Sequence, residues 1–196
     1  MRMCDAERAA KHTSWRSRYV SYLDMTNSTL NYGVDPNLNV DWNGAKNALI
    51  RFDVSAIPTG SQIVSATLTL TTSASGTEAG TIEVYNVTEV WSEGTLDGAA
   101  GEANWTARQT GVNWTTAGGT HDATILTTFA PRANATAYSV IFPISVVQAW
   151  LDTPTTNNGI ILQGKTSMPK ETAAFDSREN GVASQRPTLL VMFTPP

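Results

Sequence analysis

The sequence predicts an all-β fold, an antiparallel two-sheet β-sandwich of the jelly-roll type with one short helix and an N-terminal arm. Apolar and polar residues alternate over short runs, which is typical of half-buried strands. Clusters of Gly, Pro, Asn and Asp separate these runs, as turns do. The 196 residues, 41% hydrophobic and 15% charged, suit one ordered domain. We therefore expect a single sandwich of about eight strands.

The clearest strand covers residues 62–72. Its alternation predicts one face with Ile63, Ser65, Thr67 and Thr69 and the other with Val64, Ala66, Leu68 and Leu70. Similar runs predict strands at residues 38–42, 48–54, 81–87, 137–142, 159–162, 172–175 and 188–193.

Two segments depart from the strand pattern. Residues 145–151 place Val146, Val147, Trp150 and Leu151 at helical spacing before a stop at Pro154. This predicts one short helix over an end of the sandwich. The Gly-rich and Trp-rich segment between Trp91 and Thr128 is longer than ordinary loops, and such loops usually have a function.

The N-terminus differs in charge from the rest of the chain. The first 18 residues are basic and the remainder is acidic overall, so we expect an arm over residues 1–20 and the sandwich domain over residues 21–196. A free arm is usually disordered unless a neighbour holds it. The candidate contacts with a neighbouring subunit are Arg2, Arg8, Lys11, Trp15, Arg16 and Arg18.

Several classes of protein are disfavoured. A net charge of −4 argues against nucleic-acid binding, which normally needs a dense basic face. No apolar run approaches the roughly 20 residues of a membrane helix, so membrane insertion is not expected. The first 20 residues lack the apolar stretch of a signal peptide. Cys4 is the only cysteine, so an intrachain disulfide is impossible.

Catalytic patterns are scarce. His12 and His121 are the only histidines, and no nucleophile elbow, phosphate-binding loop or metalloprotease helix is present. Residues 118–122 bring a His and an Asp close together, although surface polar groups are the commoner interpretation. The alternative of paired carboxylates from Glu93, Asp97 and Glu102 lacks a fixed spacing. We therefore expect that the protein is not an enzyme and binds no cofactor. A structural Ca2+ ion stays an open alternative.

The tryptophans offer a second kind of chemistry, because sugars stack on exposed aromatic rings. Trp105 and Trp114 lie in the long segment, and Trp42 lies at a strand end, so these three are candidate carbohydrate-binding residues. The alternative is that they close the end of the sandwich. Trp91 and Trp150 follow apolar periodicity and are expected in the core.

Arg178 is the fourth candidate carbohydrate-binding residue. A guanidinium can hold the carboxylate of an acidic polysaccharide with two hydrogen bonds. An ion pair with Glu179 that fixes a loop is the favoured alternative.

A series of short motifs runs from about Tyr22 to the C-terminus. In order they are Asn31-Tyr32-Gly33, Leu49-Ile50-Arg51-Phe52-Asp53, Ile57-Pro58, the strand at 63–70, Val84-Tyr85, Trp91-x-Glu93, Asn104-Trp105, Trp114-Thr115-Thr116, Val147-Gln148, Asn158-Gly159-Ile160, Ser177-Arg178-Glu179 and Arg186-Pro187. In order and spacing they resemble the DNRLRE family of β-sandwich domains, which is related to a carbohydrate-binding module family known for alginate binding. Members of that family are usually modules beside a polysaccharide-degrading enzyme, whereas this chain is one domain with a basic arm.

Two hypotheses follow. The first is a non-catalytic structural protein of a surface assembly, such as a virion decoration or fibre protein or an extracellular filament component, whose partners are neighbouring subunits and which can also adhere to glycans. The second, implied by the resemblance, is a carbohydrate-binding module for an acidic polysaccharide such as alginate. Context ranks the first slightly ahead, with a location on a virion surface or outside a cell.

Overall fold

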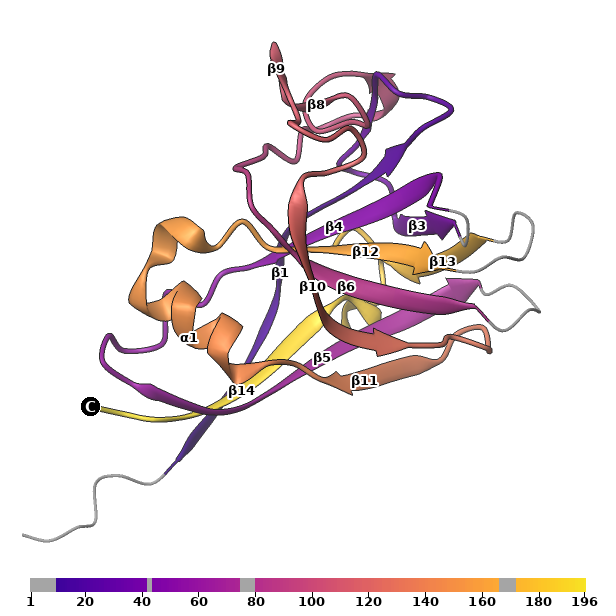
Figure 1. The fold of residues 1–196 in the computed structure, drawn as a ribbon. Helices are drawn as coiled ribbons and strands as arrows, with labels where there is room; N and C mark the ends of the chain where they lie inside the picture. The colour runs from indigo at the N-terminus through magenta and orange to yellow at the C-terminus, as the bar shows by residue number, and fades with distance from the viewer. Residues whose placement is uncertain (1–9, 42–43, 75–79, 166–171) are drawn as a thin grey trace, which may run out of the picture.

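The computed structural model describes residues 10–41, 44–74, 80–165 and 172–196. In this part of the chain, antiparallel strands form two layers, and the helix α1 (Ile144–Asp152) lies across one end (Figure 1). The first layer consists of β10 (His121–Phe129), β6 (Thr81–Val87), β12 (Ile160–Lys165), β4 (Lys46–Phe52) and β1 (Lys11–Asp24). The second consists of β1, β14 (Thr188–Thr194), β5 (Gln62–Ala74), β11 (Ala137–Ile141), β13 (Thr172–Asp176) and β3 (Asn37–Asp41). The predicted β-sandwich with one short helix is confirmed.

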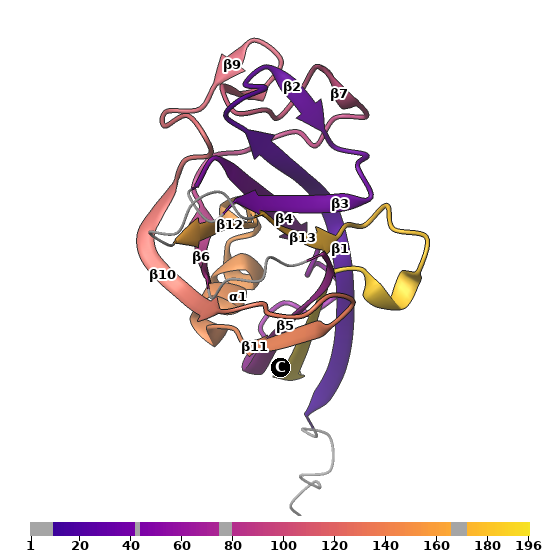
Figure 2. The ribbon, with the colours of Figure 1, turned by 90° about the vertical axis from the view of Figure 1, so that its right-hand side faces the viewer.

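Strand β1 belongs to both layers. Its residues Lys11 to Arg16 pair with β14, and the rest of the strand pairs with β4. Figure 2 shows β1 as one long strand that runs along the molecule. The register shifts between Ser17 and Tyr19, so Arg18 stands at a bulge where the strand crosses from one layer to the other. Bulges bend a strand and redirect its side chains. The bulge therefore fixes the directions of Arg18 and Tyr19.

The residues predicted to form an arm have a different position where the structure describes them. Lys11, Trp15, Arg16 and Arg18 all lie in β1, so the sandwich begins before residue 21. The first part of this strand was not predicted from the sequence, because its residues are mostly exposed on both faces and show no apolar alternation. Backbone pairing with β14 orders it instead. Arg2 and Arg8 lie outside the described residues.

The main core lies between the two layers. Alternate residues of β4 point inward, so that Ile50 and Phe52 meet Leu68 and Leu70 of β5 in one large apolar cluster. The helix adds Trp150, which packs on Phe142 at a ring distance of 5.7 Å. The alternation in the sequence thus corresponds to burial between the sheets.

One predicted face is wrong at the start of β5. Ile63 is buried and Val64 is 48% exposed, the reverse of the expectation that Val64 shares a face with Leu68. The pairing of β5 with β14 shifts register between Met192 and Phe193, and this irregularity exchanges the two faces. A bulge inverts the alternation from that point onward.

A second apolar cluster lies on the outer face of the first layer. Leu23, Leu49 and Ile161 point away from the main core, and each has no exposed surface. Residues 88–120, which we call the cover segment, pack over them with Trp91 and Trp114. The cover segment contains β7 (Asp97–Ala100), β8 (Ala107–Gln109) and β9 (Val112–Asn113), and β7 pairs with β2 (Leu30–Tyr32).

The segment predicted as one long loop therefore has two parts. Its first part is the cover segment, and its last part begins the regular strand β10. In the described residues, no helix has the length and apolar character needed to cross a membrane.

Candidate functional site

The cover segment leaves one part of the outer face open. Tyr19 of β1 and Arg51 of β4 stand side by side there as a register pair. Among the described residues, a cavity of about 450 Å³ lies on the α1 side of this pair and one of about 750 Å³ lies on the cover side. Both cavities are lined by Tyr19 and Arg51, so the pair forms a shared ridge between them.

Arg51 has an unusual environment for a cation. Its guanidinium carbon lies 4.1 Å from the centre of the Tyr19 ring and 5.6 Å from that of Trp91. Such stacking over aromatic faces favours a cation. No carboxylate in the described residues forms an ion pair with it, and burial lowers its pKa. Arg51 is thus a partly buried positive charge that has no direct ion pair in the described residues, and the Glu93 carboxylate acts on it only at longer range.

Arg18 extends the ridge on the side of α1. Its Nε donates a hydrogen bond of 3.0 Å to the Tyr19 hydroxyl, and its guanidinium pairs with Asp53. Asp53 also accepts a hydrogen bond from the Ser55 backbone N–H, and its pKa is lowered by Ser55 and by Arg18. This side of the ridge therefore carries one cation that is balanced by one carboxylate.

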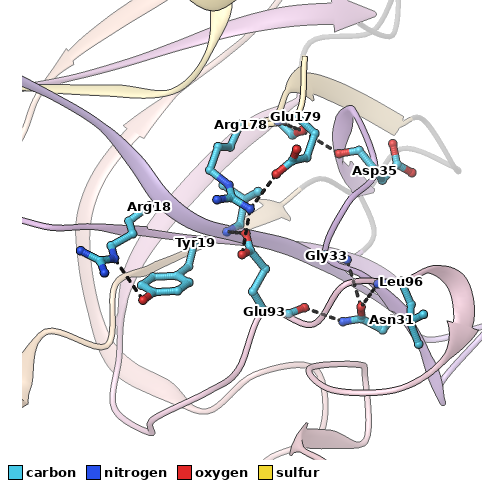
Figure 3. A network of polar contacts seen from close by, with 11 residues as sticks. Arg18, Tyr19, Asn31, Gly33, Asp35, Glu93, Leu96, Arg178 and Glu179 are labelled. Atoms are coloured by element: carbon cyan, nitrogen blue, oxygen red, sulfur yellow. Dashed lines mark hydrogen bonds and ion pairs between the residues drawn. The ribbon is translucent and has the colours of Figure 1, made fainter. Parts of the chain in front are cut away.

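Behind the ridge, Glu93 lies at the centre of a polar network (Figure 3). Its Oε1 accepts a hydrogen bond of 2.6 Å from the Val20 backbone N–H, and its Oε2 pairs with Arg178 Nη2 at 3.0 Å. Arg178 also pairs with Glu179 at 2.6 Å. Burial raises the pKa of Glu93 to about 7, against the opposing effects of the Val20 N–H and Arg178. The network connects the cover segment to β1 and to the loop after β13.

Asn31 fixes the backbone on which Glu93 stands (Figure 3). Its amide nitrogen donates to the carbonyl oxygens of Glu93 at 2.7 Å and Ala103 at 2.8 Å. Its amide oxygen accepts from the backbone N–H groups of Gly33 and Leu96, each at 3.2 Å. Asn31 has no exposed surface, so one buried side chain satisfies four backbone groups.

Trp105 and Trp114 pack against the sandwich, which is the alternative to an exposed sugar-binding platform. Trp114 is 5% exposed, and its indole nitrogen donates to the Asn104 carbonyl at 2.9 Å. Trp105 packs against the same cluster, and its ring lies where a side chain on Gly118 would be. Both rings therefore serve to close the outer face. Trp42 lies outside the described residues.

Trp91 and Trp150 are buried, as predicted. Trp91 donates from its indole nitrogen to the Asn158 carbonyl at 2.7 Å, which ties the cover segment to the start of β12. Arg178 is in ion pairs, which is the favoured alternative of the sequence analysis, and the structure adds Glu93 as its second partner.

The structure also shows where the other candidate carboxylates and His121 lie. Glu102 lines the cover-side cavity and accepts a hydrogen bond from the Thr110 backbone N–H, whereas Asp97 lies in β7 away from that cavity. His121 packs on Tyr85 with ring centres 4.4 Å apart. Within the described ranges, no three His, Cys, Asp or Glu side chains are grouped to hold a metal ion.

Sequence reasoning missed Arg51 and Tyr19 as site residues. A signal was present, because Arg51 is the one charged residue in the apolar run 48–52 and must point to the outer face. The basic N-terminal pattern predicts Arg18 as a subunit contact, whereas in the structure Arg18 lines the α1-side cavity. The motif at 49–53 lines both cavities, which together with the ridge we call the cleft, and the motif at 91–93 lines the cover-side cavity. The motif at 177–179 joins them through the ion pair between Arg178 and Glu93.

Comparison with known proteins defines the class. The model of carbohydrate-binding module family 96 matches residues 18–193. The chain belongs to this family of carbohydrate-binding modules. Such modules are typically non-catalytic and usually act outside the cell or on a surface. The family match agrees with the relation implied by the resemblance, whereas the DNRLRE name itself stays a resemblance.

Other comparisons add little. A search of curated proteins gave no match. A solved structure titled "Structure of infectious bursal disease virus Gx strain" aligns at 12% identity over 97% of this chain and 37% of that chain. Its TM-score is 0.18, so the alignment carries no argument about fold or function. The chain spans little more than a third of that chain, and the expected location on a virion gains no support.

Proposed function

We propose that this protein binds an acidic polysaccharide, such as alginate, without catalysis, and that Arg51 holds a carboxylate of the sugar chain. The observation that carries the proposal is the position of Arg51 on the ridge between two cavities, with no ion-pair partner in the described part of the chain. Membership of a carbohydrate-binding module family supports the class of ligand.

Burying a charge without a direct ion pair costs free energy. Arg51 is partly desolvated and has no direct ion pair in the described residues, and its pKa is lowered because burial outweighs the longer-range effect of Glu93. A ligand carboxylate removes the cost and gains charge-assisted hydrogen bonds, two if the guanidinium binds with both nitrogens. Tyr19 holds the guanidinium in place by stacking, so little conformational entropy is lost on binding.

The hypothesis of a surface assembly protein ranks behind this proposal. One of its grounds, beside the lack of a signal-peptide pattern and the single domain, is that residues 1–20 need a neighbouring subunit to become ordered. From Lys11 onward these residues pair with β14 and β4 of the same chain, so no second subunit is required to order them. The family match also favours glycan binding over assembly.

The test is calorimetric titration of alginate into the wild-type protein and into Arg51→Gln. Loss of one charge-assisted contact should weaken binding about tenfold or more, and added salt should weaken the wild-type binding. Arg132→Gln is the matched control, since Arg132 is exposed and lies outside both cavities. Binding by Arg51→Gln at wild-type affinity would overturn the proposal.

A further inference from the structure

We infer that the α1-side cavity is a second sugar subsite, so that the protein binds the interior of a chain that crosses the Tyr19–Arg51 ridge. This inference rests on the proposed function and adds the form of the ligand. Its basis is the arrangement of the two cavities, which share Tyr19 and Arg51 and extend from opposite sides of that pair. A ligand confined to one cavity would leave the other side of the ridge empty.

The α1-side cavity has the chemistry of a sugar site. Its floor is apolar and comes from Ile57, Trp150 and Leu151, all of which are buried. Exposed Ser55 and Thr59 add hydroxyl groups. Sugars combine apolar C–H faces with hydroxyl groups, so a site with an apolar floor and a few polar groups suits them. Its volume of about 450 Å³ is in the range of ordinary ligand sites.

The cover-side cavity is larger and different in charge. It is about 750 Å³ in volume, and Glu93, Glu102 and Gln109 are among its lining residues. Glu93 is paired with Arg178, whereas no described cation pairs with Glu102. This cavity therefore suits sugar hydroxyl groups and disfavours a second carboxylate next to Glu102.

The charged side chains of the two cavities favour one orientation of the bound sugar chain. Cationic groups of the cleft, Arg18 and Arg51, lie at the ridge and on its α1 side, and the carboxylate that lacks an ion pair among the described residues lies on the cover side. An acidic chain is therefore bound with a carboxylate at the ridge and with its hydroxyl groups in the cover-side cavity. Binding both cavities at once gains contacts for a single loss of translational freedom, so affinity rises with chain length.

The test is calorimetric titration of the full chain with alginate disaccharide, tetrasaccharide and hexasaccharide. We expect the affinity to rise about tenfold or more between the disaccharide and the longer chains. Thr59→Trp fills the α1-side cavity and should remove this rise while the disaccharide binds as before. Thr124→Trp is the matched control, because Thr124 is exposed on β10 and lines neither cavity.

The outcomes separate the two proposals. Equal affinity for all three lengths, with binding still lost in Arg51→Gln, would overturn the second subsite and leave the proposed function standing. An unchanged rise with length in both Thr59→Trp and a second filling variant, Ser55→Trp, would also overturn it. Failure of the alginate polymer and of every oligosaccharide to bind would overturn both proposals.

Discussion

Leu49 and Arg51 lie two residues apart on β4 and point to the same outer face, yet they have opposite environments. Leu49 is fully buried beneath the cover segment, whereas Arg51 stands at the open cleft beside Tyr19. The same strand thus contributes to a closed apolar half and an open charged half of one surface. The closed half supplies stability, and the open half keeps a cation available for a ligand. Perturbing each half separately tests this division.

The largest effect is expected from removing the closure. Trp91→Ala leaves a cavity where the buried indole packs and removes its hydrogen bond to the Asn158 carbonyl. We expect the free energy of unfolding to fall by about 5 kcal/mol, measured by urea denaturation. Trp105→Ala, at a partly exposed position of the same cluster, should cost clearly less. Equal losses for the two variants would mean that the cluster does not depend on Trp91.

A smaller loss is expected from Asn31→Ala. The substitution leaves the carbonyls of Glu93 and Ala103 and two backbone N–H groups without their buried partner. We expect a cost of about 4 kcal/mol, and because the Glu93 backbone is released, weaker alginate binding as well. Asn113→Ala, at an exposed position of the cover segment, is the control and should be near neutral. A near-neutral Asn31→Ala would show that the cover segment does not need this anchor.

The smallest effect depends on pH. Burial raises the pKa of Glu93 to about 7 from an ordinary value of 4.5. Between these values the folded protein keeps a proton that the unfolded chain has released, so stability falls as the pH rises. The fall should be up to about 3 kcal/mol between pH 4.5 and pH 7, measured by urea denaturation at several pH values.

Glu93→Gln should remove this part of the pH dependence, since Gln has no titrating group. Glu179→Gln is the control, because it removes the exposed carboxylate that pairs with the same arginine; since burial is the main cause of the raised Glu93 pKa and Glu179 a lesser one, most of the fall should remain. An identical pH profile for wild type and Glu93→Gln would show that Glu93 does not titrate in this range.

The regular strands and α1 could be predicted because their apolar periodicity follows directly from burial on one side. The N-terminal part of β1 could not, since backbone pairing with β14 holds it while its side chains stay mostly exposed. Val64 was assigned to the wrong face because a register irregularity between distant strands leaves no local pattern. Such failures occur wherever long-range pairing decides the structure.

The candidate site was predictable only in part. Arg178 and the loop tryptophans stood out by residue type, but whether a tryptophan is a ligand platform or a cover depends on which surface it meets. The apolar outer positions Leu23, Leu49 and Ile161 decide this, because they need to be covered. Arg51 can be recognised as a candidate site residue only from the structure, which shows that the cover segment leaves it at an open cavity.

The shared strand has a consequence for the order of folding. Lys11 pairs with Phe193, so the first described strand joins the last described strand. During synthesis, β1 can pair with β4 soon after residue 52 emerges, but its other half must wait for β14. Until then one layer lacks its junction to the other, and the edge of β1 is exposed to neighbouring chains. Rapid emergence of β14 from the ribosome should therefore limit aggregation of the nascent protein.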